Sequence, residues 1–247
     1  MKKKILSLML ASLLIFSMAA CGGTETPNST ETQEESTVSE TTGTATPTPT
    51  VPPTATPTPE PIIAPYETDL TSGAYYVGFH IPEGVYNVTV NSGVGNILTK
   101  TGITSALGSA SGVSYADSYN NLTLANGDIL KVTQSLNIKI TTQEAYYSTM
   151  QSYNNTATQP MELSAGNYVI GQDIPAGIYD ISTTGDLVTV NTNDFSVSAT
   201  LTSNETLASS SATSYKNAEL LEGQTLTVQS GAVTLTPTAN ITPLTPQ

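Results

Sequence analysis

The sequence predicts an all-β protein, with two tandem small antiparallel β-sandwich-like domains after a disordered Thr/Pro-rich tether. Three observations support this: apolar and polar residues alternate along several short runs, one block of motifs occurs twice, and the segment before them has almost no large apolar side chains. Alternation with a period of two places one side of a strand on a core and the other in water.

The leader covers residues 1–20 and resembles a lipoprotein signal peptide. Three lysines precede an apolar run of 16 residues, too short for the roughly 20 that span a bilayer as a helix. The run ends in Met18-Ala19-Ala20-Cys21, which resembles the lipobox of bacterial lipoproteins, with Met18 where that family usually has Leu. The resemblance implies that Cys21 becomes the N-terminus and carries diacylglycerol and acyl chains such as palmitate. The alternative is an ordinary secretory signal followed by an unmodified cysteine.

Lipidation of Cys21 would place the protein on the extracytoplasmic face of the cell membrane. Each buried CH₂ contributes ~0.8 kcal/mol, so several acyl chains hold a protein there stably. Residues 21–65 then form a linker that changes from Thr/Glu/Ser-rich to Thr/Pro-rich. Such a composition favours disorder, and full extension would reach on the order of 130 Å. We expect a spacer; O-glycosylation and recognition of its proline motifs are the alternatives.

Strands are predicted where Thr, Val and Ile alternate with polar residues, because branched side chains favour the pleated backbone. Asn126-Gly127-Asp128 and Glu222-Gly223-Gln224 lie between such runs as turn signals. Any helix is confined to the stretches around residues 103–107 and 143–152. The clearest alternating runs are residues 85–90, 136–141, 195–201 and 233–236.

Two sequence blocks recur in the same order, which indicates a duplicated domain. Residues 70–86 match residues 163–179 at an offset of 93, and Tyr119 to Val132 match Tyr215 to Val228 at an offset of 96. The predicted organisation is copy one at 66–142, an inter-domain linker at 143–160, copy two at 161–236 and a flexible tail at 237–247.

The repeated Ile-Pro-x-Gly-x-Tyr motif predicts a turn that leads into a strand. Proline fixes φ at the first corner, and we expect Gly84 and Gly177 to take the positive φ that follows. The tyrosine ring is expected to cover the domain's edge while its hydroxyl reaches water or a backbone partner. The residues assigned this structural role are Gly78, Ile81, Pro82, Gly84, Tyr86 and Gly127 in copy one, and Gly171, Ile174, Pro175, Gly177, Tyr179 and Gly223 in copy two.

The motif Gly-x-Tyr-x-x-Gly-x-Asp-Ile-Pro-Ala-Gly-x-Tyr, followed by Tyr-x-Asn-x-x-Leu-x-x-Gly-Asp-x-Leu-x-Val, resembles an uncharacterised small β domain of secreted and lipid-anchored Gram-positive proteins. The resemblance covers residues 70–142 and 163–236. Copy one departs from the motif at His80, where the pattern has Asp, and copy two departs at Gln224, where it also has Asp. The resemblance implies surface location and a β fold, but no activity and no functional residues.

Charge and composition exclude several function classes. The formal net charge is −13, and three of the seven basic residues are Lys2, Lys3 and Lys4 in the leader. The chain therefore has no basic surface for nucleic acid or for anionic lipid headgroups. One Cys cannot form an internal disulfide, and one His cannot supply the usual zinc cluster.

Candidate chemistry is sparse. His80 is interpreted as a polar residue at a turn entry, because its counterpart is Asp173; a catalytic base or a metal ligand is the alternative. Oxygen-rich loops at 191–194 and 117–121 lack EF-hand spacing and do not support calcium, so we expect no metal and no cofactor beyond the lipid on Cys21. Several unmatched tyrosines could form a carbohydrate-binding platform, but edge packing is favoured.

The sequence favours a non-enzymatic, lipid-anchored surface protein whose duplicated β modules serve binding or spacing at the cell envelope. The expected partners are the membrane through the lipid, and a cell-wall polymer or surface protein, with no nucleic acid. One alternative is an accessory cell-wall or glycan hydrolase, because two carboxylates can suffice for glycoside hydrolysis. A second is a solute-binding receptor of a transporter.

Overall fold

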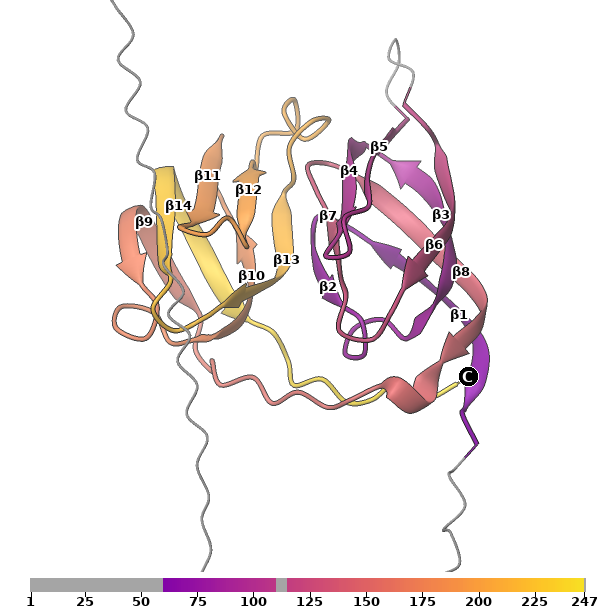
Figure 1. Cartoon of the computed structure of the whole chain (residues 1–247). Helices are drawn as coiled ribbons and strands as arrows, with labels where there is room; N and C mark the ends of the chain where they lie inside the picture. Colours follow the sequence, from indigo (N-terminus) through magenta and orange to yellow (C-terminus); the bar gives the residue numbers. More distant parts are fainter. Residues whose placement is uncertain (1–59, 110–114, 247) are drawn as a thin grey trace, which may run out of the picture. The chain divides into compact units, whose positions relative to one another are not determined.

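The all-β fold class is confirmed. The computed structural model describes residues 60–109 and 115–246, which contain fourteen strands and one three-residue 3₁₀ turn (Figure 1). The leader, Cys21 and nearly all of the tether lie outside the described residues. Among the described residues, no helix is long and apolar enough to cross a membrane.

Copy one consists of two sheets that share one core. The strand order is β1-β8-β3-β6 in one sheet and β2-β7-β4-β5 in the part of the larger sheet that belongs to this copy, with antiparallel pairing throughout. Its central side chains include Tyr86, Ile97, Leu122 and Ile140, all fully buried. The elements are β1 (Ile63–Leu70), β2 (Gly73–Tyr76), β3 (Glu83–Ser92), β4 (Val94–Thr99), β5 (Thr104–Gly108), β6 (Ser118–Leu124), β7 (Ile129–Val132), β8 (Asn137–Tyr146) and η1 (Tyr147–Thr149).

Copy two repeats this strand order with two longer strands. β9 corresponds to the end of β1 together with β2, and β14 corresponds to β7 and β8, with a register shift between Val228 and Ala232. β14 pairs with β9, β10 and β11, and a second core forms around Tyr179, Leu201 and Leu235. The elements are β9 (Met161–Val169), β10 (Gly177–Ser182), β11 (Val188–Thr192), β12 (Ser198–Leu201), β13 (Ser214–Leu220) and β14 (Thr225–Pro237).

Several predicted boundaries differ from the structure. β1 begins three residues before the predicted domain start, and β8 continues to Tyr146 because its end pairs with both β1 and β3. No helix forms around residues 103–107, where the sequence allowed one: residues 104–107 lie in β5, paired with β4. Of the stretch 143–152, only η1 is helical.

Two further expectations on local structure are corrected. Phe195 lies in the turn before β12 rather than in a strand, with φ at +57°. The tail beyond β14 is not simply free, because Ile241 and Tyr153 exchange two backbone hydrogen bonds of 2.8 and 3.0 Å. That contact ties the tail to the linker between the copies.

The glycines of the repeated turn match the prediction in part. Gly78 and Gly171, which follow β2 and β9, have φ of +92° and +90° and so take the left-handed conformation that favours glycine. Gly84 does not have a positive φ; a Cβ there would lie 3.1 Å from the carbonyl oxygen of Glu144. Gly177 has the predicted positive φ, at +159°, and a Cβ on it would lie 2.7 Å from that of Ala157. Close approach of another segment, rather than a positive φ, explains glycine at position 84, whereas at position 177 both apply.

The motif tyrosines are core residues rather than edge residues. Tyr86 and Tyr179 are fully buried, and their hydroxyls donate to the carbonyl oxygens of Pro82 and Pro175 at 2.7 and 2.8 Å. Each bond spans four residues and fastens the turn to the strand that follows. The backbone partner was one of the two predicted destinations of the hydroxyl.

Tyr86→Phe is expected to lower the free energy of unfolding by about 1 kcal/mol, because the carbonyl of Pro82 loses its buried donor. Urea denaturation measures this. Tyr168→Phe is the matched control, since Tyr168 makes the same kind of bond to Ser164 in an exposed position where water can replace it. Equal losses in the two variants would contradict the proposed role of burial.

The two copies are joined by strand pairing, which the sequence did not reveal. β2 pairs with β13 in parallel, with Gly73 opposite Lys216, and the amide of Lys216 donates to the carbonyl oxygen of Ser72 at 2.9 Å. Lys131 Nζ donates to the carbonyl oxygen of Ser196 at 2.7 Å. Ala74, Tyr76 and Ile129 of copy one pack into the core cluster of copy two.

Candidate functional site

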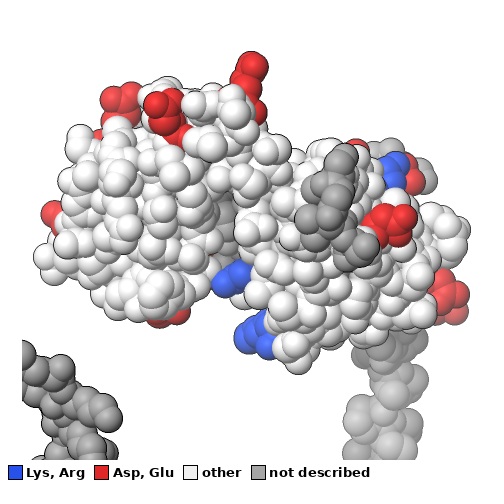
Figure 2. Space-filling view, turned by 90° about the horizontal axis from the view of Figure 1, so that it is seen from above, with Lys and Arg blue, Asp and Glu red and all other residues white. Residues whose placement is uncertain are grey.

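Charged side chains are sparse on the described surface, so shape and hydrogen bonding dominate its chemistry. The face in Figure 2 is mostly uncharged, with scattered acidic side chains and few lysines. Two ion pairs occur among the described residues: Lys216 with Asp180 at 2.7 Å, and the exposed pair of Lys139 with Glu67 at 3.4 Å.

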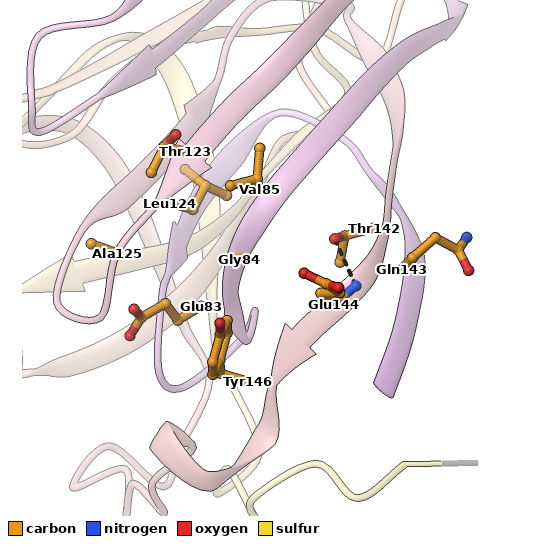
Figure 3. A pocket seen from close by; sticks show the side chains of 10 residues that line it. All are labelled: Glu83, Gly84, Val85, Thr123, Leu124, Ala125, Thr142, Gln143, Glu144 and Tyr146. Carbon is orange, nitrogen blue, oxygen red and sulfur yellow. Dashed lines mark hydrogen bonds between the residues drawn. The ribbon is translucent and has the colours of Figure 1, made fainter. Parts of the chain in front are cut away.

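The candidate site is a hollow of about 350 Å³ on copy one, where β3 begins and β6 and β8 end (Figure 3). Gly84 has no side chain to fill it, and the register of β3 with β8 shifts between Gly84 and Asn87. Such irregularities commonly redirect side chains next to functional sites. The lining residues are Glu83, Gly84, Val85, Thr123, Leu124, Ala125, Thr142, Gln143, Glu144 and Tyr146.

The hollow combines an apolar floor with oxygen-bearing side chains. Val85 is 52% exposed and lies on the outward face of β3, between the buried Gly84 and Tyr86. Glu83, Glu144 and the Tyr146 hydroxyl provide hydrogen-bonding groups around it (Figure 3). Glu83 accepts weakly from the amide of Asn126 at 3.4 Å. A neutral ligand bearing hydroxyl or amide donors fits this chemistry.

The matching surface of copy two is covered by the chain itself. Ile178, the counterpart of Val85, is only 4% exposed. Asn155 bridges to it, accepting from the Ile178 amide at 3.0 Å and donating to the Ile178 carbonyl at 2.7 Å, and Thr156 donates to the carbonyl of Ala176. The linker thus covers in copy two the position that is open in copy one.

His80 and Asp173 perform the same structural task. His80 Nδ1 accepts from the amide of Tyr76 at 3.1 Å, and a carboxylate oxygen of Asp173 accepts from the amide of Val169 at 2.8 Å. Each closes the turn before its Ile-Pro pair. Burial lowers the pKa of His80 to about 4, an effect that the charge of Asp180 partly opposes.

The lowered pKa of His80 predicts a loss of stability in mild acid. Near neutral pH both states leave the ring unprotonated; as pH falls from ~6.5 toward 4, the unfolded chain binds a proton that the folded chain does not. The free energy of unfolding should therefore fall by up to about 3 kcal/mol in this window. His80→Asn keeps an acceptor without titrating, so urea denaturation at both ends of the window should show less pH dependence. An unchanged pH dependence would contradict the assignment.

The two glycine turns use interchangeable polar bridges. Gly127 and Gly223 have φ of +83° and +84°. In copy one, Asp128 binds the facing hairpin by accepting from the amide of Lys100 at 2.8 Å. In copy two, Gln224 donates to Asp194 at 2.8 Å. Hydrogen bonds from Thr192 and Ser196 hold the pKa of the Asp194 carboxyl well below its usual range.

The remaining sequence candidates are distributed rather than clustered. In residues 60–109 and 115–246, no group of three or more His, Cys, Asp or Glu side chains could hold a metal ion. In the predicted oxygen-rich loops, Asp194 binds Thr192, Ser196 and Gln224, and Asn191 accepts from Ser198. Of the unmatched tyrosines, Tyr146 lines the hollow. Cys21 lies outside the described residues.

No protein-family model, curated protein or solved structure matches this chain.

Proposed function

We propose that this chain is a non-enzymatic, lipid-anchored surface protein that presents two joined β modules for binding or spacing at the cell envelope. The leader and Cys21 support the anchor, and the Thr/Pro-rich linker supports display away from the membrane. The observation that carries the binding role is the contrast between Val85, which is 52% exposed, and its covered counterpart Ile178, at 4%. The proposed partner is a cell-wall polymer or a surface protein.

The turn residues support a structural use of the polar groups. His80, Asp128 and Gln224 all bind backbone amides at turns or hairpins. Stabilisation of turns and hairpins thus explains why these polar side chains lie where they do. Val85 faces solvent because β3 alternates, with the buried Gly84 and Tyr86 on either side of it, and what sets it apart is that its counterpart Ile178 is covered.

A retention assay tests the binding role. The chain from residue 22 onward, which contains every described residue, is incubated with isolated cell-wall polymers and with surface-protein preparations. We expect retention that Val85→Lys reduces roughly tenfold, equivalent to about 1.4 kcal/mol. Leu187→Lys is the matched control, because Leu187 is similarly exposed, at 48%, but belongs to copy two. Absence of retention on every preparation would overturn binding and leave spacing.

A second candidate, an accessory cell-wall or glycan hydrolase, is favoured by the two carboxylates in the hollow. Glu83 and Glu144 both line it, and glycoside hydrolysis can proceed with a pair of carboxyl groups. Release of reducing sugar from wall polymer, abolished by Glu83→Gln or Glu144→Gln, would support this candidate. No turnover by the unaltered chain would remove it.

A further inference from the structure

The junction between the copies joins two different sheet edges. Copy one contributes β2 and copy two contributes β13. Each copy therefore keeps, outside the junction, the counterpart of the strand edge that the other copy places in the junction. In copy one this is β6, the counterpart of β13; in copy two it is the end of β9, residues 166–169, the counterpart of β2. A contact between unlike surfaces of equivalent modules leaves one complementary edge at each end.

Both remaining edges lack a second strand within the described residues. β6 pairs with β3, and β9 pairs with β14. Ala74, inside the junction, is 3% exposed, whereas its counterpart Asn167 on β9 is exposed. Lys216 of β13 is half-buried, whereas its counterpart Asn120 on β6 is exposed. Edge strands carry unpaired N–H and C=O groups that can pair with another chain.

A glycine that occurs at the same position in both copies is a second, independent observation that the β9 edge suits strand pairing. At the junction, Gly73 has a φ of +158° and a Cβ on it would lie 2.6 Å from the carbonyl oxygen of Lys216, so the backbone and the pairing both favour glycine. The counterpart on β9 is also a glycine, Gly166. A Cβ there would meet only the ring of its neighbour Tyr168, at an ordinary 3.4 Å. The described chain does not require glycine at 166, but an approaching strand like β13 would.

We propose that the β9 edge of one molecule pairs with the β6 edge of a second copy of this chain, repeating the internal junction and forming head-to-tail rows. Gly166 would lie opposite Asn120, as Gly73 lies opposite Lys216. The amide of Asn120 would donate to the carbonyl of Ala165. This assembly does not depend on the proposed binding function.

The contact between molecules is expected to be weaker than the one within the chain. Tyr76 and Ile129, which pack into the partner core, have the counterparts Val169 and Thr225. Lys131, whose ammonium bonds across the junction, has the counterpart Thr227. Association should therefore be reversible, and holding many molecules on one surface would favour it by raising their local concentration.

Sedimentation velocity of the chain from residue 22 tests the proposal. We expect the sedimentation coefficient to rise with concentration, and Gly166→Ala to keep the chain monomeric while its thermal unfolding is unchanged. A chain that stays monomeric at every concentration, both in solution and when coupled at its N-terminus to vesicles, would overturn the proposal. Association that Gly166→Ala leaves intact would also overturn it.

Cross-linking checks the register. The chain from residue 22 has no cysteine, since Cys21 is the single one in the sequence. A variant with Asn120→Cys and Asn167→Cys, treated with a short bis-maleimide, should give a ladder of multimers. A variant with Asn120→Cys and Glu205→Cys is the control, because Glu205 is also exposed but belongs to neither β6 nor β9. We expect at least tenfold more multimer from the first pair, and equal yields would contradict the predicted pairing.

Discussion

Gly73→Ala is expected to separate the two copies and to lower the free energy of unfolding by about 3 kcal/mol, the upper range for overpacking at a site that cannot yield. The new Cβ would lie 2.6 Å from the carbonyl oxygen and 2.7 Å from the Cβ of Lys216. Neither atom is the end of a flexible side chain, so the strands must move apart. Their separation would expose Ala74 and the apolar side chains that cross the junction.

Urea denaturation of the chain from residue 22 measures this effect. Because strand pairing joins the copies, we expect one transition for the unaltered chain and two for Gly73→Ala. The matched control is Gly166→Ala, measured at low concentration, where the added Cβ meets only the Tyr168 ring and stability should change by less than about 0.5 kcal/mol. A single unshifted transition in Gly73→Ala would show that β2 and β13 do not join the copies.

Local patterns predicted the strands well because the period of a strand is itself local. The alternating runs at 85–90 and 233–236 lie within β3 and β14, with buried and exposed residues in turn. The same reasoning failed at Gly84. Its need for glycine comes from the carbonyl of Glu144, which lies far along the chain on a different strand. A turn rule applied to neighbouring residues cannot detect such a contact.

The junction lacked a local signal for the same reason. Gly73 and Lys216 are far apart in sequence, and the apolar residues around Gly73 resemble those of any core strand. A comparison of the copies with each other contains the missing information. Ile129 of copy one is apolar while its counterpart Thr225 is polar, and Ile129 packs against the other copy. Positions that are apolar in only one copy thus mark surfaces on which the copies differ.

The candidate hollow could be predicted in part from the same comparison. Val85 and Ile178 match in the repeat, so sequence alone assigns both to similar environments. The exposure of the two side chains differs because Asn155 binds the backbone of Ile178. Asn155 belongs to the linker, which lies outside the repeated blocks. Which of two equivalent surfaces stays open is thus decided by residues outside the repeated block.

Asp128→Ala is expected to lower the free energy of unfolding by about 3 kcal/mol, because it leaves several donors without acceptors in a place where water has little access. The Asp128 side chain belongs to a residue only 4% exposed. One carboxylate oxygen accepts from the amides of Lys100 and Ile129, both at 2.8 Å, and the other accepts from the hydroxyl of Thr101 at 3.1 Å. Urea denaturation measures the loss.

Two comparisons distinguish this bridge from simple loss of packing. Asp128→Asn retains one carbonyl oxygen for the two amides and should lose about 1 kcal/mol. Gln224→Ala should also lose less than Asp128→Ala, because the carboxylate of copy two lies on the opposite side of its bridge. Asp194 keeps its bonds from Thr192 and Ser196 when Gln224 is removed. Equal losses for Asp128→Ala and Asp128→Asn would contradict the bridge, because the carbonyl oxygen that Asn retains would then contribute nothing to stability. The hairpin in copy one depends on an acid supplied by the turn, whereas the hairpin in copy two carries its own.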